Sequence, residues 1–177
     1  MSHFLSRQIT ISVFFVLGLL VCGARTQATD ISDTISTTLT IFEDSKLVGD
    51  VTCDVAGAPC IKFGAPGITL RLNGFTLKGR ASPPNNCTGF PTPFVPEDGI
   101  TTAGQSNVAI LGPGLVRNFA RMGILLSLGS SQVRVERVTA ADNCFSGILL
   151  SGATNSDITH NVSVRNFGFA GTACGGT

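Results

Sequence analysis

The chain has 177 residues, a formal net charge of +1 and only 13% charged residues. Nucleic acids and anionic membrane surfaces are bound by clustered Lys and Arg, so this charge balance predicts neither as a partner. The length is enough for one domain with a core of its own.

Residues 1–28 have the organisation of a secretory signal. Arg7 supplies a positive charge, residues 9–21 form an apolar run, and small residues lead to Ala28. The run is short for a transmembrane span, so we expect cleavage, no transmembrane anchor, and a secreted or periplasmic protein. An uncleaved anchor and lipidation at Cys22 are the alternatives.

Cysteines in an exported chain favour disulfides. A turn-like link joins Cys53 to Cys60, which predicts a disulfide between these two. The odd count after the signal leaves one thiol free, intermolecular, or paired outside the chain. No Cys-x-x-Cys pair is present, so a structural zinc site is not expected. The five cysteines after the signal are Cys53, Cys60, Cys87, Cys144 and Cys174.

Residues 29–60 are interpreted as an N-terminal cap with the first strands, and residues 61–177 as repeated coils. The repeat is marked by four evenly spaced glycines, and a short β-prone run beginning with Ile follows each of the first three. An earlier unit begins at Ile61. The four glycines are Gly99, Gly123, Gly147 and Gly171.

A second strand is expected in each unit, at Val108, Val133 and Ile158, with Ile68 as the earlier counterpart. Residues 80–98 interrupt the repeat and contain five prolines. We interpret them as an inserted loop that projects from one corner.

A third segment in each unit ends at an asparagine, namely Asn118, Asn143 and Asn166. Asparagine tolerates a left-handed backbone, and its amide can bond to copies above and below. We therefore expect these three residues to form a ladder at equivalent corners. Phe119, Phe145 and Phe167 recur beside them and predict an internal aromatic stack.

These units predict an all-β parallel β-helix of four to five coils of about 24 residues. No sustained 3.6-residue period is present, and the strands are too short for a stable hairpin sheet. Stacked coils let each strand pair with the strands above and below. A β-sandwich or propeller would need repeated hairpin turns, and Asn73-Gly74 is the only Asn-Gly.

Residues 68–77, 108–114 and 142–148 resemble bacterial secreted right-handed parallel β-helix repeat proteins of the pectin-lyase-like superfamily. The resemblance covers roughly residues 45–177. It implies right-handed coils but no single activity, because the superfamily includes lyases, hydrolases, adhesins and a copper-delivery protein.

The motifs by which polygalacturonases resemble one another are absent, so no catalytic residue is predicted. Glu136 and Asp142 fall in one unit and are candidates to face a common groove. Arg117 and Arg165 each precede a corner asparagine and are expected to stack on one edge. They are also candidates for ligand binding, and for the base that a lyase would need. Copper delivery is not expected, because His160, expected in mid-strand, is the one histidine after the signal.

Phe90 and Phe94 in the insertion are candidates for contact with a glycan. The favoured function is a secreted non-catalytic scaffold that binds a surface, an extracellular glycan or a cell-surface partner. The alternative is a polysaccharide lyase or glycoside hydrolase, or an inactive fragment of one. No cofactor or metal is expected, and calcium enters only under the lyase alternative.

The C-terminus starts a new unit at Gly171, and six residues including Cys174 follow it. The end of a stacked coil exposes unpaired backbone groups and apolar side chains. We expect either a β-helix truncated from a longer one, or end-to-end self-association.

Overall fold

The computed structural model describes residues 28–81, 87 and 96–167. Some of the predicted features fall outside these ranges: residues 1–27 of the signal, most of the insertion with Phe90 and Phe94, and the C-terminal Gly171 and Cys174. The described residues form thirteen strands and no helix.

The strands form two sheets, which we call sheet A and sheet B. Sheet A has eight strands in the order β1-β3-β5-β8-β10-β12, with β6 between β3 and β8 and with β13 on β10. Its strands are β1 (Thr29–Ile35), β3 (Ser45–Cys53), β5 (Thr69–Arg71), β6 (Thr76–Lys78), β8 (Ala109–Arg117), β10 (Arg134–Ala141), β12 (Asp157–Thr159) and β13 (Val162–Val164).

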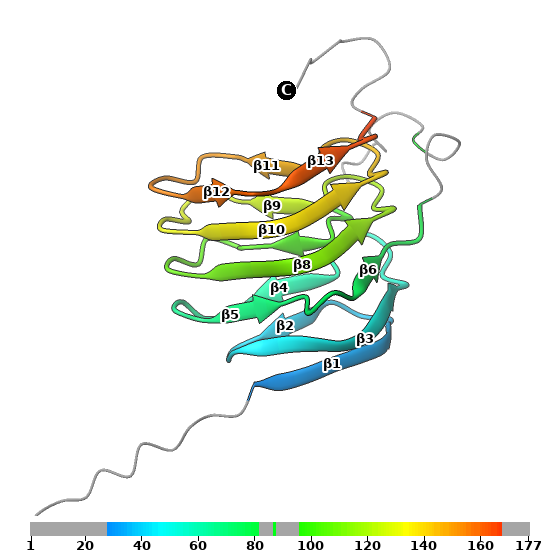
Figure 1. Cartoon of the computed structure of the whole chain (residues 1–177), viewed down its shortest axis with the longest axis horizontal. Coiled ribbons are helices and arrows are strands. Elements are labelled where there is room, and N and C mark those ends of the chain that lie inside the picture. The colour runs from blue at the N-terminus through cyan, green and yellow to red at the C-terminus, as the bar shows by residue number, and fades with distance from the viewer. Residues whose placement is uncertain (1–27, 82–86, 88–95, 168–177) are drawn as a thin grey trace, which may run out of the picture.

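Sheet B has five strands in the order β11-β9-β7-β4-β2. They are β2 (Leu39–Ile41), β4 (Ile61–Phe63), β7 (Ile100–Thr101), β9 (Ile124–Leu126) and β11 (Ile148–Leu150). Figure 1 shows sheet A in front, stacked from β1 at the bottom to β12 and β13 at the top, with sheet B behind it.

The sequence repeat is visible in the register of sheet B. Ile61, Ile100, Ile124 and Ile148 are paired one above the other, and all strand pairings among the described residues are parallel. Consecutive parallel strands need a connection that crosses to the other end of the sheet, and here sheet B supplies the returning strand. The arrangement is all-β and parallel, and it is compatible with a parallel β-helix.

Parallel pairing begins earlier in the chain than the coils recognised in the sequence. β1 pairs with β3, and β2 pairs with β4. The segment interpreted as a cap and first strands thus takes part in both sheets from Thr29 onward.

The second strand of the last unit is shifted from its expected register. Ile158 pairs with Val135, and Val135 pairs with Ile110, so Ile158 does not align with Val133. The step along the chain from Arg134 to its partner Asp157 is shorter than the step from Ala109 to Arg134. The displacement spans an even number of positions, so the same side chains still face inward and the hydrophobic pattern does not reveal it.

The core lies between the inward faces of the two sheets. Leu70, Ile110 and Val135 form a fully buried row in sheet A, and Ile100 and Ile124 belong to a facing row in sheet B. Each such side chain stabilises the fold by about 1.5–3 kcal/mol through burial.

Sheet A bends in the middle of each unit. Asp33, Asn73, Arg137 and His160 have positive φ at four of these bends. Asn161 helps to hold the last bend, because its Nδ2 donates to the Val135 carbonyl at 2.8 Å. His160 is therefore a bend residue between β12 and β13, which corrects the mid-strand position expected for it.

Candidate functional site

Two hydrogen-bonded asparagines, the buried Asn143 and the partly exposed Asn166, lie at the corner that follows the third strand in the last two units. Asn143 is fully buried, and its Nδ2 donates to Oδ1 of Asn166 at 2.9 Å. Oδ1 of Asn143 in turn accepts the backbone N–H of Phe119 at 3.1 Å. The two amides therefore satisfy buried polar groups and join neighbouring coils.

The predicted ladder is wrong by one residue at Asn118. Arg117 pairs with Ala141, and Ala141 pairs with Val164, so Asn118 aligns with Asp142 and Arg165. The step from Arg117 to its partner Ala141 is shorter by one position than the step from Asn118 to Asn143. Asn118 instead donates from Nδ2 to the Ala81 carbonyl at 3.1 Å, at the start of the insertion.

The predicted aromatic stack is also not formed as expected. Phe119 is buried and aligns with Asn143, whereas Phe167 is 41% exposed and its N–H donates to the Asn143 carbonyl. The N–H of Phe145 donates to the Arg121 carbonyl, a third position along the corner. The three phenylalanines recur in the sequence repeat, but they occupy three different positions along the corner.

Arg117 and Arg165 do lie near one another on the same edge, through Asp142. Arg165 donates to both carboxylate oxygens of Asp142, each at 2.7 Å. This hydrogen-bonded pair, and then the charges of Arg165 and Arg117, lower the pKa of Asp142. Nε of Arg117 is buried, and within the described residues it has no hydrogen-bond partner.

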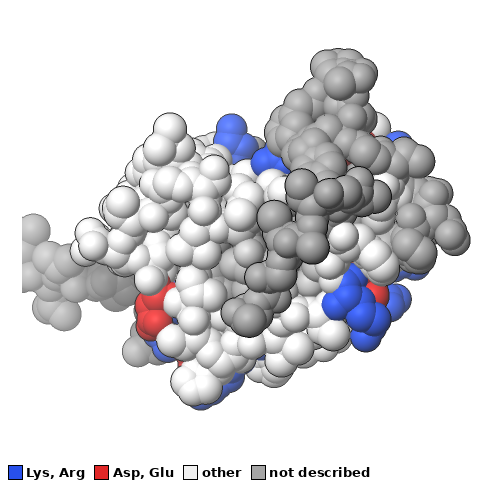
Figure 2. Space-filling model, turned by 90° about the horizontal axis from the view of Figure 1, so that it is seen from above, with Lys and Arg blue, Asp and Glu red and all other residues white. Residues whose placement is uncertain are grey.

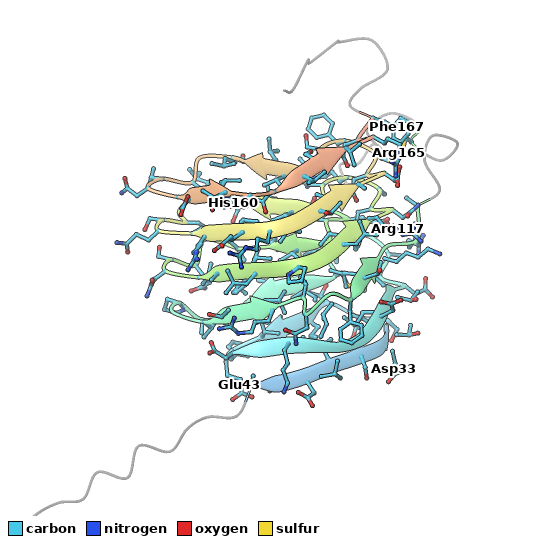
Figure 3. All side chains as sticks on the ribbon, viewed as in Figure 1. Asp33, Glu43, Arg117, His160, Arg165 and Phe167 are labelled. Carbon is cyan, nitrogen blue, oxygen red and sulfur yellow. A yellow bond between two sulfur atoms is a disulfide. The ribbon has the colours of Figure 1, made fainter. Side chains whose placement is uncertain are left out.

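Figure 3 shows Arg165 near the upper end of the molecule and Arg117 below it on the same side. Figure 2 views that end from above, with basic side chains gathered beside an acidic one on one side.

Glu136 and Asp142 do not form the acidic pair that a hydrolase needs. They lie on either side of the bend in β10, a separation of roughly 15–20 Å. Paired catalytic carboxyl groups lie about 5–9.5 Å apart in glycoside hydrolases. Glu136 is bound instead by Arg134 and by Nε of Arg137, the latter at 3.4 Å.

A buried carboxylate, that of Asp98, lies where the insertion rejoins the sheets. Asp98 is 2% exposed; its Oδ1 lies 3.0 Å from Nε of Arg121 in an ion pair and accepts the N–H of Met122 at 3.2 Å. Burial raises the pKa of Asp98 to about 6, against the opposing influence of Arg121. No local sequence signal predicts this pair, because Asp98 and Arg121 meet only through the stacking of coils.

The two ends of the insertion are tied together. Nε of Arg80 lies 3.9 Å from Oε2 of Glu97, and Nη1 of Arg80 lies 3.7 Å from Oδ1 of Asp54. Oε1 of Glu97 accepts the N–H of Gly57 at 2.9 Å. Glu97 thus links the insertion to the turn between Cys53 and Cys60.

Two disulfides lie around this corner. The predicted Cys53–Cys60 disulfide is present, and Cys87 pairs with Cys144, a connection that the sequence left open. Cys87 lies inside the insertion, so the second disulfide holds the insertion against the corner after β10. We call Arg80, Glu97, Asp98, Cys87 and Cys144, together with their contacts, the insertion anchor.

A small cavity lies beside the anchor, between the Cys53–Cys60 disulfide, Asp98 and Phe119. The space open to the centre of a water molecule is about 10 Å³. This is about the volume that one water requires, so the cavity does not admit a sugar ring.

Among the residues described, no group of three or more His, Cys, Asp and Glu side chains is arranged to hold a metal ion. The same residues include no helix long and apolar enough to cross a membrane.

No protein-family model matches the chain, and neither the curated proteins nor the solved structures gave a match. The chain is therefore identified by its own architecture: an all-β protein of two parallel sheets, whose described part carries two disulfides.

Proposed function

We propose that this chain is a right-handed parallel β-helix of the pectin-lyase-like superfamily, exported from the cell, that acts as a non-catalytic scaffold. Its role is to present the 80–98 insertion to an extracellular glycan or a cell-surface partner. The insertion anchor is the observation that carries the proposal.

The anchor holds the insertion at both ends and at Cys87. The Arg80–Glu97 contact closes the two ends, Asp98 binds Arg121 in the next coil, and Cys87 is bonded to Cys144. Binding loops that are fixed in place lose less conformational entropy when they bind, so anchoring favours affinity. Loops held on a rigid framework are a common location of binding sites.

The non-catalytic part of the proposal is supported by how the acidic side chains are used. Asp98, Glu136 and Asp142 each contact an arginine; the contacts of Asp98 and Asp142 join neighbouring coils, and that of Glu136 with Arg134 lies within β10. A general acid or base has to reach a substrate atom directly or through one water. The cavity beside Asp98 has room for about one water.

The alternative, a polysaccharide lyase or glycoside hydrolase, has one observation in its favour. The pKa of Asp98 is raised to about 6 by burial, as a general acid near neutral pH requires. A lyase would in addition need calcium, and Arg117 as a candidate base.

A glycan-binding and glycan-degradation screen, run with and without calcium, separates the two functions. The scaffold predicts binding without cleavage, and Phe90→Ala together with Phe94→Ala is expected to weaken that binding. Phe42→Ala is the matched control, because Phe42 is 68% exposed and lies outside the insertion. Cleavage that is lost in Asp98→Asn would establish the enzyme instead.

A further inference from the structure

Two positively charged side chains lie next to one another on the outer face of sheet A. Lys78 ends β6 and Arg117 ends β8, and the two residues are Cα partners across these strands. Leu77 and Val116, which precede them, are fully buried, so Lys78 and Arg117 both point outward. Neighbouring strands lie about 4.8 Å apart. Figure 1 shows β6 beside the end of β8.

The chain supplies no carboxylate side chain to balance these two charges. All eleven Asp and Glu residues lie within the described ranges, and none of them forms an ion pair with Lys78 or Arg117. The strand neighbours on either side of the two cations are Thr52 and Ala141, which are uncharged. Like charges at directly opposed strand positions repel one another, so contacts within the chain do not explain why these two lie together.

The carboxylates that are close to Lys78 and Arg117 in register already have partners. Those partners are Arg165 for Asp142, Arg80 for Asp54, and the backbone N–H of Thr76 for Asp50. Nε of Arg117 is buried and has no hydrogen-bond partner in the part of the chain that the structure describes. Packing, rather than hydrogen bonding within the chain, therefore holds this guanidinium in place.

We propose that Lys78 and Arg117 form a binding site for a phosphoryl group. A phosphate monoester carries a charge of about −1.5 to −2 near neutral pH and has three acceptor oxygens. It can therefore balance both cations at once, whereas a single carboxylate balances only one of them. Arginine binds phosphate oxygens through two parallel N–H donors, and lysine binds them as a point charge.

The site lies beside the insertion to which glycan contact was assigned above. The insertion begins two residues after Lys78. Asn118, which follows Arg117, donates from Nδ2 to the Ala81 carbonyl at 3.1 Å. A sugar bound to the insertion can therefore place a phosphoryl group on both cations. The inferred ligand is a phosphorylated sugar; the sugar as the source of the group rests on the proposed function, whereas the phosphoryl site does not.

Isothermal titration calorimetry of the full chain, in a phosphate-free buffer at about 0.05 M salt, tests the site. The probes are inorganic phosphate, glucose 6-phosphate, glucose and glucuronate. We expect both phosphates to bind, and glucose and glucuronate to bind at least about tenfold more weakly than glucose 6-phosphate, because they carry no charge or about half the charge. No binding of either phosphate, or equal binding of glucuronate, would overturn the proposal.

Two variants remove the cations one at a time. Lys78→Ala and Arg117→Gln are each expected to weaken phosphate binding about tenfold or more. Lys62→Ala and Arg71→Gln are the matched controls, because these exposed side chains of β4 and β5 likewise form no ion pair in the described residues. Both controls are expected to bind as the unchanged chain does. Binding that survives the first two changes, or that is weakened equally by the controls, would place the anion elsewhere and refute the site.

Thr52→Glu keeps the test decisive if Arg117→Gln does not fold. Thr52 is exposed and is the Cα partner of Lys78, so a glutamate there supplies from within the chain the negative charge that Lys78 lacks. We expect this variant to bind phosphate about tenfold more weakly than Thr52→Gln, which has a similar shape without the charge. Equal affinities of the two variants would also refute the site.

The insertion separates the two sources of the phosphoryl group. Glucose 6-phosphate is expected to bind more tightly than inorganic phosphate, and the combined Phe90→Ala and Phe94→Ala change is expected to abolish only that difference. Equal binding of the two probes, still dependent on Lys78 and Arg117, would mean that the site holds free phosphate and would overturn the sugar as the source. That result would count against the proposed glycan contact, whereas loss of all phosphate binding would count against the site itself.

Discussion

The buried carboxylate of Asp98 makes the stability of the fold depend on pH. It forms an ion pair with Arg121 and accepts the backbone N–H of Met122, yet burial raises its pKa to about 6. The folded state therefore binds this proton more tightly than the unfolded state does, and the stability due to this group is lost as pH rises from about 4 to about 6. Asp142 behaves oppositely, because Arg165 lowers its pKa and its contribution is lost as pH falls.

Asp98→Asn is expected to remove one pH-dependent part of the stability. A pKa raised from 3.8 to about 6 corresponds to about 3 kcal/mol between about pH 4 and about pH 7. Relative to the unchanged chain, Asp98→Asn should thus gain about that amount in unfolding free energy over this pH range, measured by urea denaturation. A difference between the two proteins that does not vary with pH would contradict the assignment.

At the scale of the element, the glycines of the sequence repeat have a packing role. A Cβ on Gly99 would come within 2.4 Å of the Gly123 carbonyl, and a Cβ on Gly123 within 2.7 Å of the Gly147 carbonyl. Neither Gly99 nor Gly123 has a positive φ, in contrast to turn glycines such as Gly104. The repeat thus marks where successive coils approach most closely.

Gly123→Ala is expected to destabilise the fold by about 1–3 kcal/mol, because the added methyl group meets backbone of the next coil. Gly49→Ala is the control, since a Cβ there meets its nearest atom at an ordinary 3.8 Å. Its unfolding free energy should change by about 0.5 kcal/mol or less. Equal effects of the two changes in denaturant unfolding would show that close coil packing is not the cause.

The two disulfides are expected to differ in their contribution. Cys53 and Cys60 have a sequence separation of 7, and Cys87 and Cys144 have a separation of 57. Chain entropy alone gives about 2 kcal/mol for the shorter loop and about 4 kcal/mol for the longer one.

Replacing both cysteines of one disulfide at a time by Ala, and measuring unfolding by denaturant, tests which disulfide stabilises the fold more. Peptide mass mapping under non-reducing conditions checks that the remaining bond keeps its partner. A smaller loss for the Cys87–Cys144 variant would mean that native contacts outweigh loop closure.

For the whole molecule, the repeat was predictable because inward-facing residues such as Ile100, Ile124 and Ile148 keep a constant spacing. The register was less predictable, because positions are gained or lost in the turns and at the bend within β8 and β10, where no hydrophobic pattern marks them. Asn118 and Ile158 were misplaced for this reason. The Asp98–Arg121 contact and the Cys87–Cys144 disulfide depend on how coils stack, which no local pattern encodes.

The Cys87–Cys144 disulfide also determines what a protease can separate. A cut at any one peptide bond between these two cysteines leaves Cys87 on one fragment and Cys144 on the other, still covalently joined. Limited proteolysis within residues 88–98 is therefore expected to give two fragments on a reducing gel but a single species on a non-reducing gel. The protein can lose the continuity of its backbone there and remain one molecule, which would suit the extracellular location proposed for it.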